Sequence, residues 1–250
     1  MTVCLTAQES DRSSVEELIF RCFPEDSEDF LHGVMRNIFS PDEALLMKTD
    51  GVISSAVLLP RFTLSDGRHF GYVYCLCTAY EFRGMGLMRK LLDQAEDLCS
   101  KRGDSFVALV PANEALAKTY SKMGYSPVTC TKLCGAAAEF SFDSRAKEED
   151  IPLINDMYEK QFASVPHVVR SQELWKTLMA LYSLDGGGIF LHDGGYLFAE
   201  RHNDGYIIRE AAGTKIPDGV GALLPSFKGT PRVFAKGYNG NSPLLNLLFD

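Results

Sequence analysis

The segment Arg83-Gly84-Met85-Gly86 follows an apolar, cysteine-containing run and opens a regular helical pattern. Where a strand passes through a glycine-containing loop into a helix, several backbone N–H groups point at one spot, and the helix dipole favours negative charge there. Gly84 and Gly86 allow a ligand to approach the backbone closely, and the guanidinium of Arg83 adds a cation. These residue types at this spacing predict a site for a phosphate or pyrophosphate group.

Two common nucleotide-binding motifs do not fit this segment. The stretch "GMGLMR" lacks the third glycine of a dinucleotide fingerprint and the lysine of a phosphate-binding loop. The strand before it is also the last of an antiparallel meander, whereas the dinucleotide motif follows the first strand of a parallel βαβ unit. A nicotinamide-dependent oxidoreductase is therefore disfavoured. A tight turn without any ligand stays open as the structural alternative.

The elements around this loop alternate between helical and strand patterns. Apolar residues recur with helical spacing in four segments, at residues 13–23, 27–39, 83–101 and 113–123. Between the second and third of them, residues 43–78 hold three apolar runs separated by the hairpin dipeptides Asp50-Gly51 and Asp66-Gly67. Further strands are expected in "SFVALV" and "YSPVTCTKLCG". The sequence therefore predicts an α/β fold with a mixed, mostly antiparallel sheet flanked by helices.

Two motifs in this half resemble those of a known family. The segment "RGMGLM" resembles the R/Q-x-x-G-x-G/A signature of the GNAT N-acetyltransferases, which holds the pyrophosphate of coenzyme A. Downstream, "NEALAKTYSKMGY" is similar to the family's N-x-x-x-x-x-x-Y-x-x-x-G-F/Y segment. The resemblance covers residues 5–135. It implies the GNAT fold, acetyl-CoA as co-substrate without a metal, and N-acetyltransferase activity on a small-molecule or peptide amine.

The resemblance also implies the site residues. In the family, the last meander strand separates from its parallel neighbour at a bulge, and the thioester lies in the gap. Tyr120 would be the general acid, because a phenol with an ordinary pKa of about 10 suits a departing thiolate. Asn113 would bind the pantetheine, and Met88 replaces the family's glycine or alanine at a position used through its backbone N–H. The other cofactor-binding residues would be Leu76, Cys77, Thr78, Arg83, Gly84, Met85, Gly86 and Leu87.

The sequence does not single out the general base that an amine acceptor requires. In tandem acetyltransferases of the enhanced-intracellular-survival type, the terminal carboxylate enters the active site, which makes the C-terminus a candidate here. The candidates are Glu25, Glu28, His69, Glu81 and the carboxylate of Asp250. A catalytically silent acyl-CoA-binding or sensing protein remains the alternative function. The acceptor amine, the acyl chain length and the oligomeric state stay open.

The second half of the chain repeats the plan more weakly. Helical patterns at residues 148–162 and 171–184 precede a three-strand meander over 188–213. We therefore expect an N-terminal GNAT acetyltransferase domain at 1–138 and a smaller, degenerate GNAT-like domain at 139–250. The corresponding loop, "GTKIPDGVGALLP", has no arginine, and its Pro225 is expected to cut the following helix short. Coenzyme A binding is not expected in this half.

Composition narrows the class of protein. The 250 residues are 46% hydrophobic and 23% charged with a net charge of −8, and no lysine/arginine block occurs. A nucleic-acid binder is therefore disfavoured and a cationic substrate favoured. No apolar run approaches the roughly 18 residues of a membrane helix, and the N-terminus has no secretory pattern. We expect a cytoplasmic protein without a membrane partner, whose seven cysteines are reduced.

Several residues outside these motifs are expected to have structural roles. The pairs Cys75/Cys77 and Cys130/Cys134 lack a C-x-x-C spacing or a histidine cluster, so buried thiols are favoured over a metal site. Trp175 is expected to anchor the core of the second half. His167 and Arg170 are expected in a surface loop, which could otherwise overhang the acceptor cleft.

Overall fold

The structure, a computed structural model of the whole chain, describes residues 1–239, 243, 245 and 246. The chain forms two compact units. Unit 1 consists of residues 1–63, 67–110 and 235–239, and unit 2 consists of residues 64–66, 111–234 and 240–250. The longest stretch of unit 2 begins at residue 111, earlier than the predicted domain boundary after residue 138. The interpretation of residues 1–138 and 139–250 as two related domains stays a proposal.

Unit 1 contains a mixed, mostly antiparallel sheet, as predicted. Its strands lie in the order β1 (Thr2–Thr6), β2 (Ala44–Thr49), β3 (Val52–Leu58), β5 (His69–Thr78) and β6 (Phe106–Leu109). Strand β4 (Arg61–Thr63) pairs with β5. All of these pairings are antiparallel except that of β5 with β6, which is parallel. The parallel pair requires a crossover, which α3 supplies.

The predicted meander is present, but its middle run is not a single strand. Asp50 (φ 50°) and Gly51 (φ 86°) make the tight turn between β2 and β3, as the dipeptide predicted. The next run breaks into β3 and β4 at Leu59-Pro60. Proline has no N–H to donate to a ladder, and the Pro60 carbonyl instead accepts from the Tyr72 N–H at 2.9 Å.

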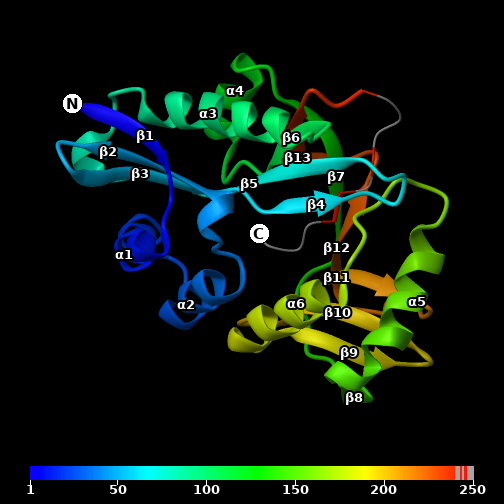
Figure 1. Cartoon of the computed structure of the whole chain (residues 1–250). Coiled ribbons are helices and arrows are strands. Elements are labelled where there is room, and N and C mark those ends of the chain that lie inside the picture. The colour runs from blue at the N-terminus through cyan, green and yellow to red at the C-terminus, as the bar shows by residue number, and fades with distance from the viewer. Residues whose placement is uncertain (240–242, 244, 247–250) are drawn as a thin grey trace. The chain divides into compact units, whose positions relative to one another are not determined.

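Three α-helices cover the two faces of this sheet. They are α1 (Arg12–Cys22), α2 (Glu28–Asn37) and α3 (Leu87–Lys101). Helix α3 lies on one face and α1 with α2 on the other (Figure 1). Residues Leu91, Leu92 and Ala95 give α3 a buried stripe at helical spacing. Helix α3 begins at Leu87 and not at residue 83, because Gly84 (φ 78°) and Gly86 (φ 72°) have left-handed backbone.

Unit 2 contains further strands with their own helices. Its strands lie in the order β7 (Ser126–Cys134), β12 (Gly221–Ser226), β11 (Gly205–Ala212), β10 (Gly195–His202), β9 (Gly188–His192) and β8 (Ser144–Arg145). Its helices are α4 (Glu114–Lys122), α5 (Ile151–Phe162) and α6 (Gln172–Leu184). Strand β13 (Thr230–Lys236) contributes residues to both units. Short 3₁₀ turns lie at Glu9–Asp11, Pro41–Glu43, Tyr80–Phe82 and Glu148–Asp150.

The glycine loop of the second half leads into a strand, so the prediction of a shortened helix before Pro225 was wrong. Residues Gly221–Ser226 form β12, which pairs parallel with β11 and antiparallel with β7. The ladder with β7 satisfies the backbone groups of the segment, and tertiary pairing therefore decides its conformation. Without a following helix, this loop has no helix dipole to attract a phosphate.

The sheet of unit 2 is covered on both faces. On one face, Tyr196 packs edge-on against Trp175 at 6.1 Å between ring centres, and Phe198 packs against Tyr182 at 4.4 Å. Trp175 is fully buried, which confirms it as the core anchor. On the other face lies a separate apolar cluster, which includes Phe190, Leu197, Ala199, Ile208, Ala222, Phe140 and Phe142.

The segment with His167 and Arg170 is not a surface loop. The two side chains belong to residues that are 2% and 4% exposed. Val168 forms a β-bridge with Leu64, and the Ser65 N–H donates to the His167 carbonyl at 2.8 Å. Arg170 forms a buried ion pair with Glu210. The buried charge of Arg170 is tolerated because Glu210 on β11 pairs with it and accepts its hydrogen bonds.

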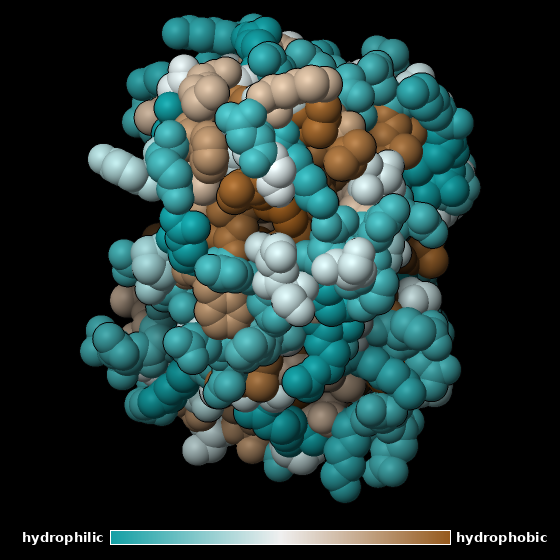
Figure 2. Space-filling view, turned by 60° about the vertical axis from the view of Figure 1, so that its left-hand side comes forward, coloured by the Kyte–Doolittle hydropathy of each residue, from teal (hydrophilic) through white to brown (hydrophobic). Residues whose placement is uncertain are grey.

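Two further observations concern the helix lengths and the hydropathy of the surface. Within residues 1–239, 243, 245 and 246, no helix is both long and apolar enough to cross a bilayer. In the view of Figure 2 the surface is mostly hydrophilic, and hydrophobic side chains gather at the floor of a hollow.

Candidate functional site

Strand β5 separates from β6 at a bulge. The parallel pairing runs from Phe70↔Phe106 to Val73↔Leu109 and ends there, while β5 continues to Thr78. The register with β3 shifts by one residue between Leu58↔Tyr74 and Ala56↔Cys77. Cys75 lies inside this shift with φ 48°, a left-handed backbone that is uncommon outside glycine. The C-terminal part of β5, after Val73, therefore has an edge that is not paired with β6.

The loop after β5 has the geometry of an anion cradle. A Cβ atom at Gly84 or Gly86 would meet nothing within 4 Å, so the surface above the loop is open. Gly86 is the N-cap of α3, so no N-cap side chain bonds to the first N–H groups of the helix. The first helical bond runs from the Lys90 N–H to the Gly86 carbonyl at 3.2 Å. The N–H groups of residues 87–89 consequently have no intrahelical acceptor, and the positive end of the helix dipole lies beside them.

Arg83 is held at the junction of β5 and the loop. Its Nε donates to the Thr78 carbonyl at 3.2 Å, and its guanidinium carbon lies 5.6 Å from the centre of the Tyr80 ring. Arg83 is exposed. Because a guanidinium has five N–H donors, the bond to Thr78 leaves donors for an anion.

The residues expected along the thioester form the end of β5. Cys77 is buried, whereas Leu76 and Thr78 are partly exposed. The Thr78 hydroxyl lies 2.9 Å from the Ser55 hydroxyl, and the Ser55 hydroxyl donates to the Cys77 carbonyl at 2.5 Å. These bonds hold the strand to β3 on the side opposite β6.

Two candidates for the general base, Glu81 and His69, are poorly placed to take a proton from an amine at the end of β5. Glu81 accepts two hydrogen bonds from Arg21 at 2.8 and 3.0 Å, and this contact lowers the pKa of Glu81. His69 is the first residue of β5 and bonds to the Thr63 hydroxyl at 2.8 Å. At about 3.3 Å per residue, it lies roughly 20 Å along the strand from Cys75.

The remaining candidates provide no alternative. Glu25 and Glu28 are exposed near the start of α2. Asp250 lies outside the described residues. The geometry of unit 1 thus does not identify a base.

Asn113 and Tyr120 belong to unit 2. The Asn113 Oδ1 accepts from the Leu116 N–H at 3.0 Å and caps α4, so its side-chain oxygen has a structural role while its amide N–H₂ remains a donor. Tyr120 is 7% exposed and packs edge-on against Tyr125 at 6.0 Å between ring centres. Burial raises the pKa of Tyr120. The phenol is therefore protonated at neutral pH, as a proton donor must be.

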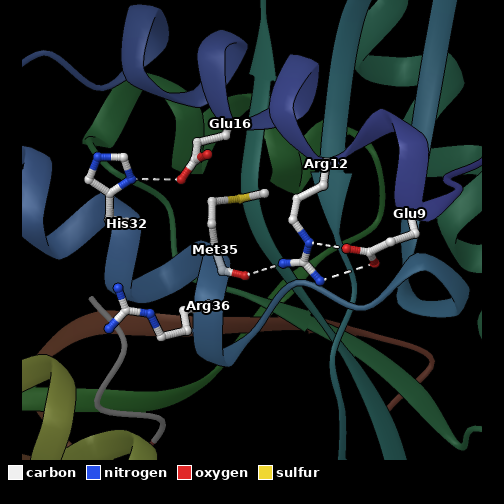
Figure 3. Close-up of a pocket in the computed structure, with 6 residues that line it drawn as sticks. All are labelled: Glu9, Arg12, Glu16, His32, Met35 and Arg36. Atoms are coloured by element: carbon white, nitrogen blue, oxygen red, sulfur yellow. Dashed lines mark hydrogen bonds and ion pairs between the residues drawn. The ribbon is translucent and has the colours of Figure 1, made fainter.

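A groove on unit 1 was not indicated by the sequence (Figure 3). It has a volume of about 450 Å³. Arg12 bonds to Glu9 and donates to the Met35 carbonyl at 2.7 Å, and His32 lies 2.8 Å from Glu16. Its charged groups thus largely pair with one another. It is lined by Glu9, Arg12, Glu16, His32, Met35 and Arg36.

Cys22 is a second feature that the sequence did not indicate. It is the last residue of α1, and its Sγ lies 3.6 Å from the Thr78 carbonyl oxygen. The thiol thus donates to the same carbonyl that accepts from the Arg83 Nε. No spacing rule connects residues so far apart in sequence. Among the residues that the structure describes, no group of three or more histidine, cysteine or acidic side chains could hold a metal ion.

The chain is similar to known proteins in sequence and in fold. Residues 5–128 match a family described as an acetyltransferase (GNAT) domain. A conserved protein of unknown function from Enterococcus faecalis V583 is 11% identical with a TM-score of 0.70, over 94% of this chain and 72% of its own. A GCN5-related N-acetyltransferase from Anabaena variabilis ATCC 29413 is 14% identical with a TM-score of 0.67, over 94% and 72%. Eis1 from Mycobacterium abscessus is 13% identical with a TM-score of 0.64, over 94% and 73%. At these identities the structural likeness concerns the fold.

Proposed function

Because residues 5–128 place this chain in the GNAT acetyltransferase family, we propose that it transfers the acetyl group of acetyl-CoA to a primary amine of a small molecule or peptide, by direct attack of the amine on the thioester. The observation that carries the proposal is the continuous segment from Cys75 to Arg89, which consists of the bulged strand end, the glycine loop and a helix start without a capping side chain. The net charge of −8 favours a cationic amine as the acceptor.

The residues of this segment fit a pyrophosphate group. Gly84 and Gly86 leave the space above the loop clear, and the unbonded N–H groups of the first helical turn are donors. Arg83 supplies a positive charge beside them. The backbone and side chains that would hold the pyrophosphate are those of Arg83, Gly84, Met85, Gly86, Leu87 and Met88. Leu76, Cys77 and Thr78 would lie along the pantetheine and thioester, together with Asn113.

The chemistry would divide among few groups. Acetyl-CoA, when bound, supplies the acyl group as an activated thioester. A backbone N–H of β5 beyond the bulge would donate to the oxygen that becomes negative, because a fixed donor needs no reorganisation at that moment. Tyr120 would donate a proton to the departing thiolate. The base is unassigned, since Glu81 is held in an ion pair and Asp250 lies outside the described residues.

A catalytically silent acyl-CoA-binding protein is the second candidate. The loop from Arg83 to Gly86 would serve either function, because cofactor binding does not depend on turnover. Tyr120 favours the enzyme, because a phenol there would supply the proton that the departing thiolate needs.

Thermal melting of the purified chain with acetyl-CoA, with coenzyme A and NADH as comparisons, tests cofactor binding. A ligand at about 100 times its dissociation constant stabilises the folded state by roughly 2.7 kcal/mol. We expect acetyl-CoA to raise the melting midpoint by several degrees and NADH to leave it unchanged. An absent shift at saturating acetyl-CoA would contradict the assignment of the loop.

Tyr120→Phe separates the two candidate functions. We expect the variant to keep the acetyl-CoA melting shift and to lose turnover by roughly 10²–10⁴-fold, measured as thiol release with a panel of amines. The matched control is Tyr125→Phe, which makes the same change in the neighbouring buried ring. Equal turnover in both variants would argue against Tyr120 as the acid. Absence of turnover in the unmodified chain with every amine would favour the silent binding protein.

A further inference from the structure

The groove on unit 1 lies beside the first half of α1. It has a volume of about 450 Å³, and its two walls come from the turn at Glu9–Asp11 with α1 and from α2 (Figure 3). Arg12 is the first residue of α1 and Cys22 is the last. At about 1.5 Å per residue, roughly 15 Å separates them along the helix. Because Cys22 is the end that meets the Thr78 carbonyl, the groove is separate from the segment proposed for acetyl-CoA.

The wall on the side of α1 has more acidic than basic groups. Its charged residues are Glu9, Arg12 and Glu16. Arg12 bonds to Glu9 through two of its nitrogens and donates to the Met35 carbonyl on α2 at 2.7 Å. These bonds hold the Arg12 guanidinium in place and leave the Glu16 carboxylate for a different partner.

Glu16 reaches across the groove to His32 on α2. The Glu16 Oε1 lies 2.8 Å from the His32 Nδ1. A carboxylate oxygen can only accept, so Nδ1 is the donor. The second oxygen, Oε2, bonds to no residue in the part of the chain that the structure describes. The Glu16 side chain is 27% exposed, so this oxygen is available as an acceptor in the groove.

Arg36 gives the wall of α2 a positive charge. It follows His32 by four residues on α2, so the two side chains lie on the same face of the helix. Arg36 is exposed and forms no hydrogen bond or ion pair with any residue that the structure describes. In Figure 3 no dashed line reaches it. Its five N–H donors are therefore available to a ligand.

We propose that the groove binds a small amino acid in its zwitterionic form, with the ammonium group at Glu16 and the carboxylate at Arg36. The two walls have opposite charge, so a ligand with both charges complements them better than a simple anion or cation does. A guanidinium pairs with a carboxylate through two parallel hydrogen bonds, and an ammonium group donates to a carboxylate oxygen. The site does not depend on the proposed function, because none of its lining residues belongs to the acyl-CoA segment.

Isothermal titration calorimetry of the full chain with single amino acids tests the site. The probes are the standard α-amino acids, β-alanine and 4-aminobutyrate, which differ in the spacing of the two charges. We expect saturable binding of at least one of them. Its methyl ester and its N-acetyl derivative each lack one charge and should bind about tenfold more weakly. Absence of binding by every probe would overturn the site, and unchanged binding of either derivative would overturn the assignment of two charges.

Substitutions in the groove test the two contacts. Arg36→Gln removes the cation without removing a contact within the protein, so we expect an unchanged melting midpoint and about tenfold weaker binding. Glu16→Gln should weaken binding similarly. The matched control is Lys101→Gln, which removes an exposed cation from the last turn of α3, on the opposite face of the sheet (Figure 1). Equal affinity in Arg36→Gln and the control would overturn the assignment of Arg36.

Titration in saturating acetyl-CoA tests whether the two sites are separate. We expect the affinity for the amino acid to stay unchanged, because the groove lies at the other end of α1. Displacement of the amino acid by acetyl-CoA would place it in the acyl-CoA site and overturn the proposal. If acetyl-CoA itself does not bind, the proposed function fails, while the titrations of Arg36→Gln and its control still decide the groove.

Discussion

Replacing Glu210 with glutamine removes the charge that balances Arg170 inside unit 2. The two side chains are 0% and 1% exposed, and the guanidinium donates two hydrogen bonds of 2.7 Å to the carboxylate. The Tyr196 hydroxyl donates a third at 2.7 Å, and the Asn246 amide donates a fourth. Glutamine keeps the shape of the side chain but puts an N–H₂ donor where one acceptor oxygen was. At least one of these four donors then faces another donor.

The size of the effect follows from the burial of Arg170. Breaking a buried ion pair by changing one partner costs about 3–5 kcal/mol, because the other charge stays desolvated. The rings of Tyr158 and Trp175 lie 4.0 and 4.6 Å from the guanidinium carbon and still stabilise the cation. We therefore expect the lower end, about 3 kcal/mol. At roughly 2–4 °C per kcal/mol for a chain of this size, the melting midpoint of unit 2 should fall by about 6–12 °C.

Differential scanning calorimetry of the full chain measures this change. The double variant Arg170→Met with Glu210→Leu should recover part of the loss, since it leaves neither charge buried, while the Tyr196 hydroxyl loses its carboxylate acceptor. The matched control is Glu139→Gln, which breaks the exposed contact of Glu139 with Arg201 and should leave the midpoint close to that of the unmodified chain. A Glu210→Gln midpoint no lower than that of the control would refute the reasoning.

Two further predictions concern unit 1. Gly86→Ala forces alanine into φ 72°, so we expect a smaller acetyl-CoA melting shift, whereas Gly103→Ala, equally strained at φ 78° but at the other end of α3, should keep the full shift; equal shifts would contradict a role for the loop. Alkylation of Cys22 should be half-maximal at about pH 6, because the thiolate exists above the lowered pKa. Arg83→Gln should move that midpoint upward, as followed by mass spectrometry with iodoacetamide; an unmoved midpoint would exclude Arg83 as a cause.

Features that depend on neighbouring residues could be predicted from the sequence. The turn at Asp50-Gly51 follows from dipeptide conformation, and the buried stripe of α3 follows from helical spacing. The glycine loop and helix after Arg83 were predicted for the same reason, since the bonds of a helix and its first turn are local. The resemblance to the GNAT signature added the family, which the match over residues 5–128 supports.

Features that depend on a partner far away in sequence required the structure. Residues 221–226 form a strand because β7 supplies their hydrogen bonds, and no local signal reports that ladder. Arg170 is buried because Glu210 meets it from β11, although its own segment is typical of a surface loop. Cys22 meets the Thr78 carbonyl at the end of β5 only because α1 packs on the sheet. The sequence by itself determined which segments could form elements and an anion cradle, because propensity and helix-end geometry are local. Tertiary packing decided which charges are buried and paired, because desolvation and pairing depend on which distant groups come into contact.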